Sequence, residues 1–121
     1  AYKAQLVTDA EIYMGCAVVF SDSVPAELSV VVPQAANDLL TINGVEASFV
    51  AVDNGAQVSV SARSMGDVNV QVIMEKLGGG GHLTMAGAQL RNVSLEEAKR
   101  RLLDAISEYR ESQRTEKQKN S

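Results

Sequence analysis

Residues 47–63, Ala-Ser-Phe-Val-Ala-Val-Asp-Asn-Gly-Ala-Gln-Val-Ser-Val-Ser-Ala-Arg, carry the clearest structural pattern in the chain. Two alternating segments, 47–52 and 57–63, are separated by Asn54-Gly55, the dipeptide that best supplies positive φ at both central positions of a tight turn. The pattern therefore predicts a β-hairpin. Its second strand places valines on one face and serines together with Arg63 on the other.

Apolar residues at three- and four-residue spacing predict three helices around the hairpin. The first covers about residues 25–42, where Pro33 requires either a kink or a helix that begins near Pro33 itself. The second covers about residues 70–77. The third follows Ser94-Leu95-Glu96-Glu97, a capping box that marks the start of a helix.

Further strands are expected outside the hairpin. Residues 12–20 are apolar and β-compatible, a shorter strand is expected at residues 4–7, and residues 86–91 form another candidate. With the hairpin, these segments give a mixed β-sheet of about five strands flanked by about three helices. The sequence thus predicts an α/β fold, with an α+β arrangement as the alternative.

Length and composition indicate one small domain in a longer protein. The chain has 121 residues, of which 45% are hydrophobic, enough for a single core. We expect the domain to occupy residues 1–111 and residues 112–121 to form a polar, disordered tail. The start at Ala1, without an initiator methionine, suggests an excised piece. No segment approaches the roughly 20 apolar residues of a membrane span, and the lone Cys16 suggests a reducing, cytoplasmic setting.

The charge balance disfavours binding of a long nucleic acid. The formal net charge is −4 and the isoelectric point is about 4.9. Binding to a long strand draws on many Lys and Arg contacts with phosphates, and often on stacking aromatic residues. The chain has only two Phe, three Tyr and no Trp. A small anionic ligand that is held by a few local donors is compatible with this composition.

Gly78-Gly79-Gly80-Gly81-His82 is a run that is costly to order, because glycine loses more conformational entropy than any other residue. Gly78 suits the left-handed position after a helix, and the following glycines leave N–H groups open to an anion. His82 would add a donor. The alternative is a helix cap with a mobile glycine turn. The run is not a P-loop, because it follows a helix and no Lys-Ser or Lys-Thr comes after it.

The chain offers a recognition surface more readily than a catalytic centre. A two-metal site needs several His and carboxylate ligands, whereas this chain has one histidine, so we expect neither a metal site nor a catalytic residue. Arg63 provides a planar, bidentate donor at a strand end, and one short turn and one helix connect it to the glycines. The alternatives are a solvent-facing Arg63, a turn residue at Ser64 and a helix-start residue at Asn69.

Two segments together resemble a known family. Residues 62–70, Ala-Arg-Ser-Met-Gly-Asp-Val-Asn-Val, and residues 74–84, Met-Glu-Lys-Leu-Gly-Gly-Gly-Gly-His-Leu-Thr, resemble the DHH-associated C-terminal domain of the DHH phosphoesterases. Segments 35–40 and 44–50 add a similarity to the GdpP-type cyclic-di-AMP phosphodiesterases of bacteria. The resemblance covers about residues 11–106. It departs at Met85, where relatives often carry asparagine, so the base preference is left open.

The resemblance implies a division of labour between two domains. A separate, covalently linked DHH domain would carry manganese and hydrolyse cyclic-di-AMP to a linear dinucleotide. This domain would close over the cleft and bind substrate without a cofactor or catalytic residue of its own. It would lie in the cytoplasm, as part of a parent protein that is anchored in the membrane. The residues implied to contact the phosphate or nucleotide are Arg63, Ser64, Asn69, Gly79, Gly80, Gly81 and His82. The alternatives are the equivalent domain of a DHH-type exonuclease or short-oligonucleotide hydrolase, and a non-catalytic nucleotide-binding module.

Overall fold

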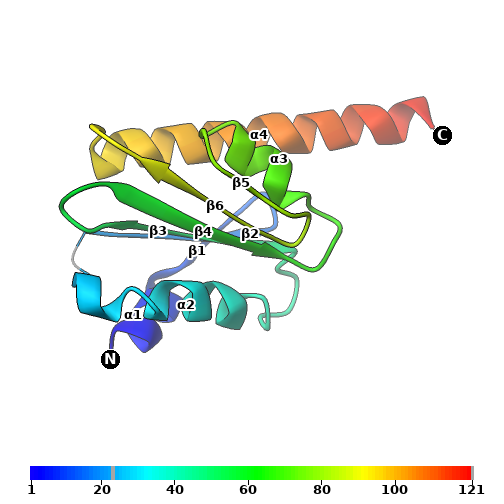
Figure 1. Ribbon diagram of the computed structural model, residues 1–121. Helices are drawn as coiled ribbons and strands as arrows, with labels where there is room; N and C mark the ends of the chain where they lie inside the picture. Colours follow the sequence, from blue (N-terminus) through cyan, green and yellow to red (C-terminus); the bar gives the residue numbers. More distant parts are fainter. Residues whose placement is uncertain (23, 121) are drawn as a thin grey trace.

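The computed structural model describes residues 1–22 and 24–120. Within them, a six-stranded sheet with the order β1-β2-β3-β4-β6-β5 lies between helices on both faces (Figure 1). The elements in chain order are α1 (Tyr2–Asp9), β1 (Glu11–Tyr13), β2 (Cys16–Ser21), the 3-10 helix η1 (Ala26–Leu28), α2 (Val31–Leu39), β3 (Ala47–Asp53), β4 (Val58–Ser64), α3 (Val70–Glu75), β5 (Gly80–Gly81), β6 (Met85–Leu90) and α4 (Leu95–Lys119). The predicted α/β class is confirmed.

The hairpin of β3 and β4 is the centre of this sheet. Its strands pair antiparallel from Ala47 opposite Ser64 to Asp53 opposite Val58. The turn has Gly55 at φ +95° and a hydrogen bond of 3.1 Å from the Asn54 N–H to a carbonyl across the turn. On its outer edges the hairpin pairs with β2 in parallel and with β6 antiparallel. The predicted hairpin is confirmed, but its turn is centred on Gly55 and Ala56, one residue later than predicted, and Asn54 does not have the positive φ expected of it.

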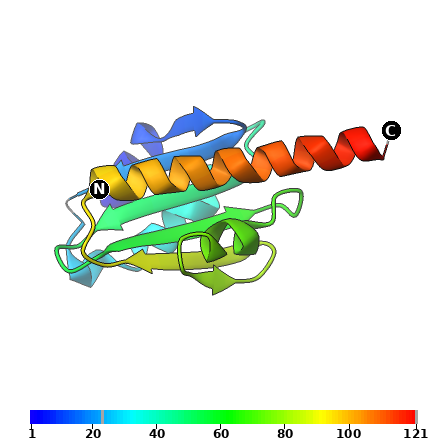
Figure 2. The ribbon, with the colours of Figure 1, turned by 90° about the horizontal axis from the view of Figure 1, so that it is seen from above.

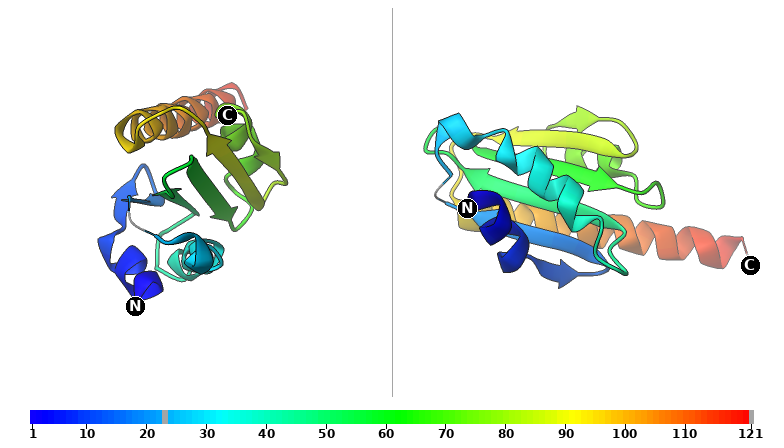
Figure 3. Two further views of the ribbon diagram at one scale, coloured as in Figure 1. Left: turned by 60° about the vertical axis from the view of Figure 1, so that its left-hand side comes forward. Right: turned by 90° about the horizontal axis from the view of Figure 1, so that it is seen from below.

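Two hydrophobic clusters, one on each face, replace the single core expected from the composition. Phe49 points to the face covered by α3 and α4, where it packs with residues such as Ile73 and Leu102 (Figure 2). Val50 points to the opposite face, where α1 and α2 contribute residues such as Leu39 (Figure 3). The central strand β3 is therefore buried on both sides.

The N-terminal strand predictions need correction. Residues 4–7 lie within the helix α1, which buries Leu6 against the face that α2 covers. A short apolar run does not distinguish a strand from a helix, and the tertiary contact of Leu6 decides the outcome. The predicted strand 12–20 is two strands, β1 and β2, because the chain reverses at Met14 and Gly15, whose φ angles are +52° and +81°.

Pro33 sets the beginning of the helix α2. The predicted helix 25–42 consists of the short η1 followed by α2, and Pro33 lies in the first turn of α2. A missing N–H is harmless there, because the first N–H groups of a helix have no partner within the helix. Of the two alternatives, the helix that begins near Pro33 is therefore the observed one. The sheet has one strand more than expected, because the helix at residues 4–7 removes one strand while the division of residues 12–20 and the pairing of residues 80–81 with β6 each add one.

The helix α4 extends through Lys119, beyond Ser112, where the sequence predicted a disordered tail. Residues 112–119 contain no glycine or proline, and Arg114 forms an ion pair of 2.8 Å with Glu111 one turn away. Gln113 also contacts the body of the domain. Beyond that contact the helix projects from the body (Figure 1), and Ser121 lies outside the described residues. Among the described residues, no helix is long and apolar enough to cross a membrane.

Candidate functional site

Arg63 lies near the end of β4, on the face of the sheet that α2 partly covers. Its Nε donates to Asn37 Oδ1 at 3.1 Å and its Nη1 donates to the Ala62 carbonyl at 2.8 Å. These bonds use two of the five N–H donors of a guanidinium. Partial burial lowers the pKa of Arg63, but an arginine stays charged at neutral pH. The structure thus fixes a positive charge beside α2.

The glycine run begins as a helix cap. The Gly78 N–H donates to the Glu75 carbonyl at 3.1 Å and the Gly79 N–H donates to the Met74 carbonyl at 2.9 Å. Together with the φ of +84° at Gly78, these two bonds form a Schellman motif, which satisfies the last carbonyls of α3. The predicted left-handed position of Gly78 after the helix is therefore confirmed.

The next glycines let two backbones approach closely. A Cβ at Gly79 would lie 2.1 Å from the Gly87 carbonyl oxygen, and one at Gly81 would lie 2.5 Å from the Cα of Ala86. A Cβ at Gly80 would meet no atom within 4 Å. Two of the glycines are thus required by contact with β6, which accounts for much of the entropic cost of the run.

The same contacts limit the number of backbone donors open to an anion. The His82 N–H donates to the Met85 carbonyl at 2.7 Å, so this N–H, like those of Gly78 and Gly79, is already bonded within the chain. Gly81 lies opposite Ala86, one position from this hydrogen-bonded pair, so its N–H points away from β6. The donors that face outward are therefore the Gly81 N–H and the exposed side chain of His82.

Ser64 and Asn69 shape the turn between β4 and α3. Ser64 Oγ donates to the Val68 carbonyl at 2.7 Å and accepts from the Gly66 N–H at 3.1 Å. Asn69 Oδ1 accepts from the N–H groups of residues 71 and 72 at 3.0 and 3.3 Å, and so caps α3. The interpretation of Asn69 as a helix-start residue is confirmed. A contact of either side chain with a ligand stays a prediction.

The strands β5 and β6 with the loop between them, residues 80–90, form a glycine hairpin, and Arg63 meets it at one end of the sheet. Arg63 lies opposite Met85 in the pairing of β4 with β6, and the Ser64 N–H donates to the Thr84 carbonyl at 3.0 Å. From α3, the Val70 N–H donates to the Leu83 carbonyl at 3.0 Å. The structure therefore brings together the two motifs that lie about twenty residues apart in the sequence. Met85 and Leu83, both exposed, give this end an apolar rim.

Sequence reasoning did not identify two supports of this site. Asn37 holds the Arg63 guanidinium, and Gln113 Nε2 donates to the Asp67 carbonyl at 2.8 Å in the turn between β4 and α3. In the same turn, the Tyr109 hydroxyl accepts from the Asn69 N–H at 2.9 Å. Nothing in the local pattern marks Asn37 or Gln113, because both contacts depend on tertiary packing.

A metal ion does not fit the donor set of this chain. Among residues 1–22 and 24–120, no group of three or more His, Cys, Asp and Glu side chains is placed to hold one. The site around Arg63 and His82 contains cationic and neutral donors, which suit an anionic ligand instead.

Comparison with known proteins identifies the family of this chain. The chain is 50% identical over 109 residues to the cyclic-di-AMP phosphodiesterase GdpP of Geobacillus thermodenitrificans (strain NG80-2), covering 88% of this chain and 17% of that protein. It is 44% identical over 109 residues to the cyclic-di-AMP phosphodiesterase PdeA of Listeria monocytogenes serotype 1/2a (strain 10403S), with coverage of 88% and 17%. The chain thus spans 17% of the length of these two relatives.

A solved structure and a family model agree with the fold. An exopolyphosphatase-related protein from Bacteroides fragilis matches with a TM-score of 0.75 at 20% identity, over 88% of this chain and 33% of that one. This likeness concerns the fold alone. The model of the DHHA1 domain matches residues 25–112, which include Arg63 and the glycine run. The chain belongs to the DHHA1 domain family.

Proposed function

We propose that this domain binds the substrate of a cyclic-di-AMP phosphodiesterase. It grips the phosphates of the dinucleotide, while a covalently linked DHH domain hydrolyses one phosphodiester bond to give a linear dinucleotide. The observation that carries this proposal is the fixed guanidinium of Arg63 beside the tip of the glycine hairpin. The 50% identity to GdpP supports the same substrate.

Three donors would contact the dinucleotide in this proposal, on two sides of β6: Arg63 lies on β4, whereas the Gly81 N–H points outward from β5 at the edge of the sheet. The guanidinium of Arg63 supplies charge and paired N–H groups, the Gly81 N–H supplies a backbone donor, and His82 supplies a side-chain donor. Ser64 and Asn69 keep the adjoining turn in shape, while Gly79 and Gly80 belong to the backbone that carries Gly81 and His82. Donors that are fixed before substrate arrives stabilise charge that develops on the phosphate during hydrolysis.

The remaining chemistry would belong to the rest of the parent protein. We infer that the DHH domain holds manganese and the attacking water, as the resemblance to the DHH phosphoesterases implies. The isolated domain would bind substrate without hydrolysing it. In this proposal the domain faces the cytoplasm and makes no membrane contact, and the parent is anchored in the bacterial membrane by other segments.

A domain from an exonuclease or short-oligonucleotide hydrolase is less favoured. Relatives that match 88% of the chain are cyclic-di-AMP phosphodiesterases. The net charge of −4 also opposes a groove that tracks a long strand. A non-catalytic nucleotide-binding module would require a parent without a DHH domain, so the sequence that precedes this domain in the parent distinguishes that alternative.

A comparison of three substrates with the full-length protein tests the proposal. Cleavage of cyclic-di-AMP, a linear dinucleotide and a longer single strand is compared for the wild type and for Arg63→Ala. We expect cyclic-di-AMP to be cleaved with the highest kcat/KM. We also expect Arg63→Ala to lower that kcat/KM by about tenfold or more, as for the loss of a charge-assisted hydrogen bond. Preferred cleavage of the long strand, or full activity of Arg63→Ala on cyclic-di-AMP, contradicts the proposal.

A further inference from the structure

A buried hydrogen bond holds the helix α2 on the sheet beside Arg63. Ser48 of β3 lies opposite Arg63 of β4, and residues that are paired across two strands point to the same face of a sheet. Ser48 is fully buried, and its Oγ donates to the Ala36 carbonyl of α2 at 2.6 Å. Asn37, the next residue along α2, contacts Arg63 itself. The backbone of α2 is therefore fixed at the point from which Asn37 contacts the guanidinium.

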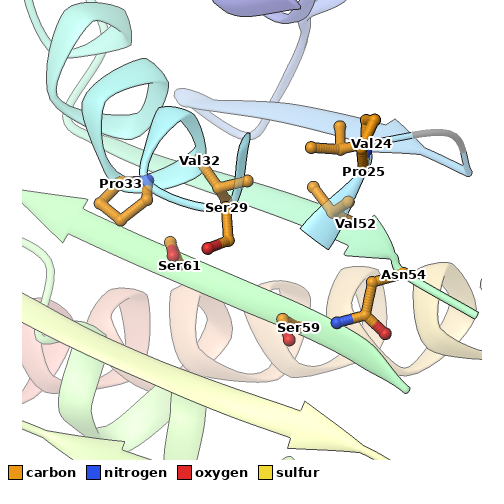
Figure 4. A pocket seen from close by; sticks show the side chains of 9 residues that line it. All are labelled: Val24, Pro25, Ser29, Val32, Pro33, Val52, Asn54, Ser59 and Ser61. Atoms are coloured by element: carbon orange, nitrogen blue, oxygen red, sulfur yellow. The ribbon is translucent and has the colours of Figure 1, made fainter. Parts of the chain in front are cut away.

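This anchoring belongs to the second half of α2. At the start of the helix, a cavity of about 120 Å³ lies between α2 and β4, and its lining includes Pro33 and Ser61 (Figure 4). Ser61 and Arg63 lie on the same face of β4, since they are two positions apart along the strand. From Ser61 to Arg63, the space between the helix and the strand thus changes from a cavity to a hydrogen-bonded contact.

The internal hydrogen bonds of Arg63 decide which part of its guanidinium is open to a ligand. Asn37 Oδ1 accepts from Nε at 3.1 Å, and the Ala62 carbonyl accepts from Nη1 at 2.8 Å. A guanidinium has one N–H on Nε and two on each Nη, so the bonds within the described part of the chain leave one N–H on Nη1 and two on Nη2. These groups lie on neighbouring nitrogens at the end of the side chain, where they suit two oxygens of one phosphate.

A side chain that is already ordered loses less rotamer freedom when it binds a ligand. Arginine has a long, flexible side chain, and ordering such a side chain during binding lowers the affinity. The two bonds of Arg63 are internal to the domain, so they order its guanidinium independently of a ligand. Asn37 is exposed, so its replacement removes one of these bonds without disturbing the hydrophobic core.

We propose that Asn37 is a positioning residue for the substrate phosphate. It holds Nε of Arg63 so that Nη1 and Nη2 face the phosphate, and Ser48 fixes α2 in the place that this requires. The inference rests on the proposed function, because it assumes that Arg63 contacts a phosphate of cyclic-di-AMP. In this proposal Asn37 acts through Arg63 and makes no contact with the substrate. The helix α2 thus contributes to binding although it lies outside the segment that connects Arg63 to the glycine run.

The first measurement follows Arg63 in the free domain. Asn37→Leu has nearly the wild-type shape but no acceptor, Asn37→Asp keeps an oxygen acceptor, and Gln34→Ala, at another exposed position of α2, is the matched control. Exchange of the Arg63 Nε–H with water, measured by NMR, should be about fivefold faster in Asn37→Leu, as for the loss of one hydrogen bond. It should be at least as slow in Asn37→Asp and Gln34→Ala as in the wild type. Equal exchange in Asn37→Leu and the wild type overturns the inference.

The second measurement is the affinity of the 121-residue chain for cyclic-di-AMP. We expect Asn37→Leu to weaken binding by about threefold to tenfold relative to Gln34→Ala, the cost of ordering one long side chain. In the Arg63→Ala background, Asn37→Leu should weaken binding no further, because Asn37 acts only through Arg63. Thermal unfolding checks that each variant is folded. A similar loss in both backgrounds indicates a direct contact or a general structural effect, and it overturns the inference.

The outcomes separate this inference from the proposed function. If the wild type binds cyclic-di-AMP and Asn37→Leu binds as tightly as Gln34→Ala, the positioning role of Asn37 is wrong while the proposed function stands. If the wild type does not bind cyclic-di-AMP at millimolar concentration, the proposed function fails, and the role of Asn37 toward a phosphate fails with it.

Discussion

Gly79 and Gly80 are neighbours with opposite steric requirements. A Cβ on Gly79 would overlap the backbone of β6, at 2.1 Å from the Gly87 carbonyl oxygen, whereas a Cβ on Gly80 points into open space. We expect Gly79→Ala to lower the free energy of unfolding by about 2–4 kcal/mol, because the backbone of β6 has to move. Gly80→Ala, the control, should change it by less than about 1 kcal/mol. Urea unfolding of the two variants measures the difference, and equal effects would contradict the close approach of β5 and β6.

Cys16 is fully buried beneath the turn at Gly15, with its Sγ 3.9 Å from Arg110 Nη2. Burial raises the pKa of this thiol above its ordinary value of 9.0, although the nearby guanidinium acts in the opposite direction. Above pH 9.0 the thiol of the unfolded chain therefore loses its proton before that of the folded chain. The unfolded state then binds fewer protons, so the free energy of unfolding falls as the pH rises.

The expected loss attributable to Cys16 is at most about 1.4 kcal/mol per pH unit above the thiol's ordinary pKa. Chemical denaturation at pH 7.5 and at pH 10 measures it, with Cys16→Ala as the control that subtracts every other titrating group. The wild type should lose more stability than Cys16→Ala over this interval. An equal loss in both proteins would show that the thiol pKa is not raised.

At the scale of elements, α4 links the core of the domain to the turn beside the site. Its first half packs on the sheet, and its later residues Tyr109 and Gln113 bond to the turn between β4 and α3. Arg110 adds an ion pair of 2.9 Å with Glu46, just before β3. The second half of α4 therefore helps to hold the turn that follows Arg63.

Loss of the Gln113 side chain should loosen that turn. We expect Gln113→Ala to lower the free energy of unfolding by about 1 kcal/mol, the usual net value of one hydrogen bond, and to speed amide exchange at residues 66–69. Ser112→Ala, an exposed neighbour on the same helix, is the matched control and should leave exchange unchanged. If exchange in the turn is the same in both variants, α4 does not support the turn.

The elements that the sequence predicted well are those with local signals. Asn54-Gly55 marks the hairpin correctly, although the turn is centred on Gly55 and Ala56 and Asn54 Oδ1 accepts from the N–H groups of residues 56 and 57. Ser94 caps α4 by accepting from the Glu97 N–H at 3.0 Å, as its capping box indicated. The element α1 was missed because it depends on the packing of Leu6 with α2, which is distant in sequence, and the short strand β5 was missed because glycine is depleted in strands. Gly80 becomes part of a strand only because it pairs with Gly87.

At the scale of the whole molecule, the candidate site lies where segments from both faces of the sheet meet. The sequence connected Arg63 to the glycine run through one helix. The structure places Arg63 opposite Met85, just beyond the end of that run. The sequence did not indicate Asn37, because its contact with Arg63 depends on the packing of α2 against β4, which no local sequence pattern predicts. The alternatives that it offered for Ser64, a turn residue, and for Asn69, a helix-start residue, are both observed.

Titration of this chain with cyclic-di-AMP, followed through backbone amide shifts, tests the central claim most directly. We predict saturable shifts at Arg63, Gly81 and His82. In Arg63→Ala the affinity should fall by about tenfold or more, since a charge-assisted hydrogen bond to the phosphate is lost. Arg114→Ala, which removes an exposed arginine on the projecting part of α4, is the control for net charge and should bind as the wild type does. If the amides of Arg63, Gly81 and His82 stay unmoved at millimolar cyclic-di-AMP, or if Arg63→Ala and Arg114→Ala weaken binding equally, the proposed phosphate grip is contradicted.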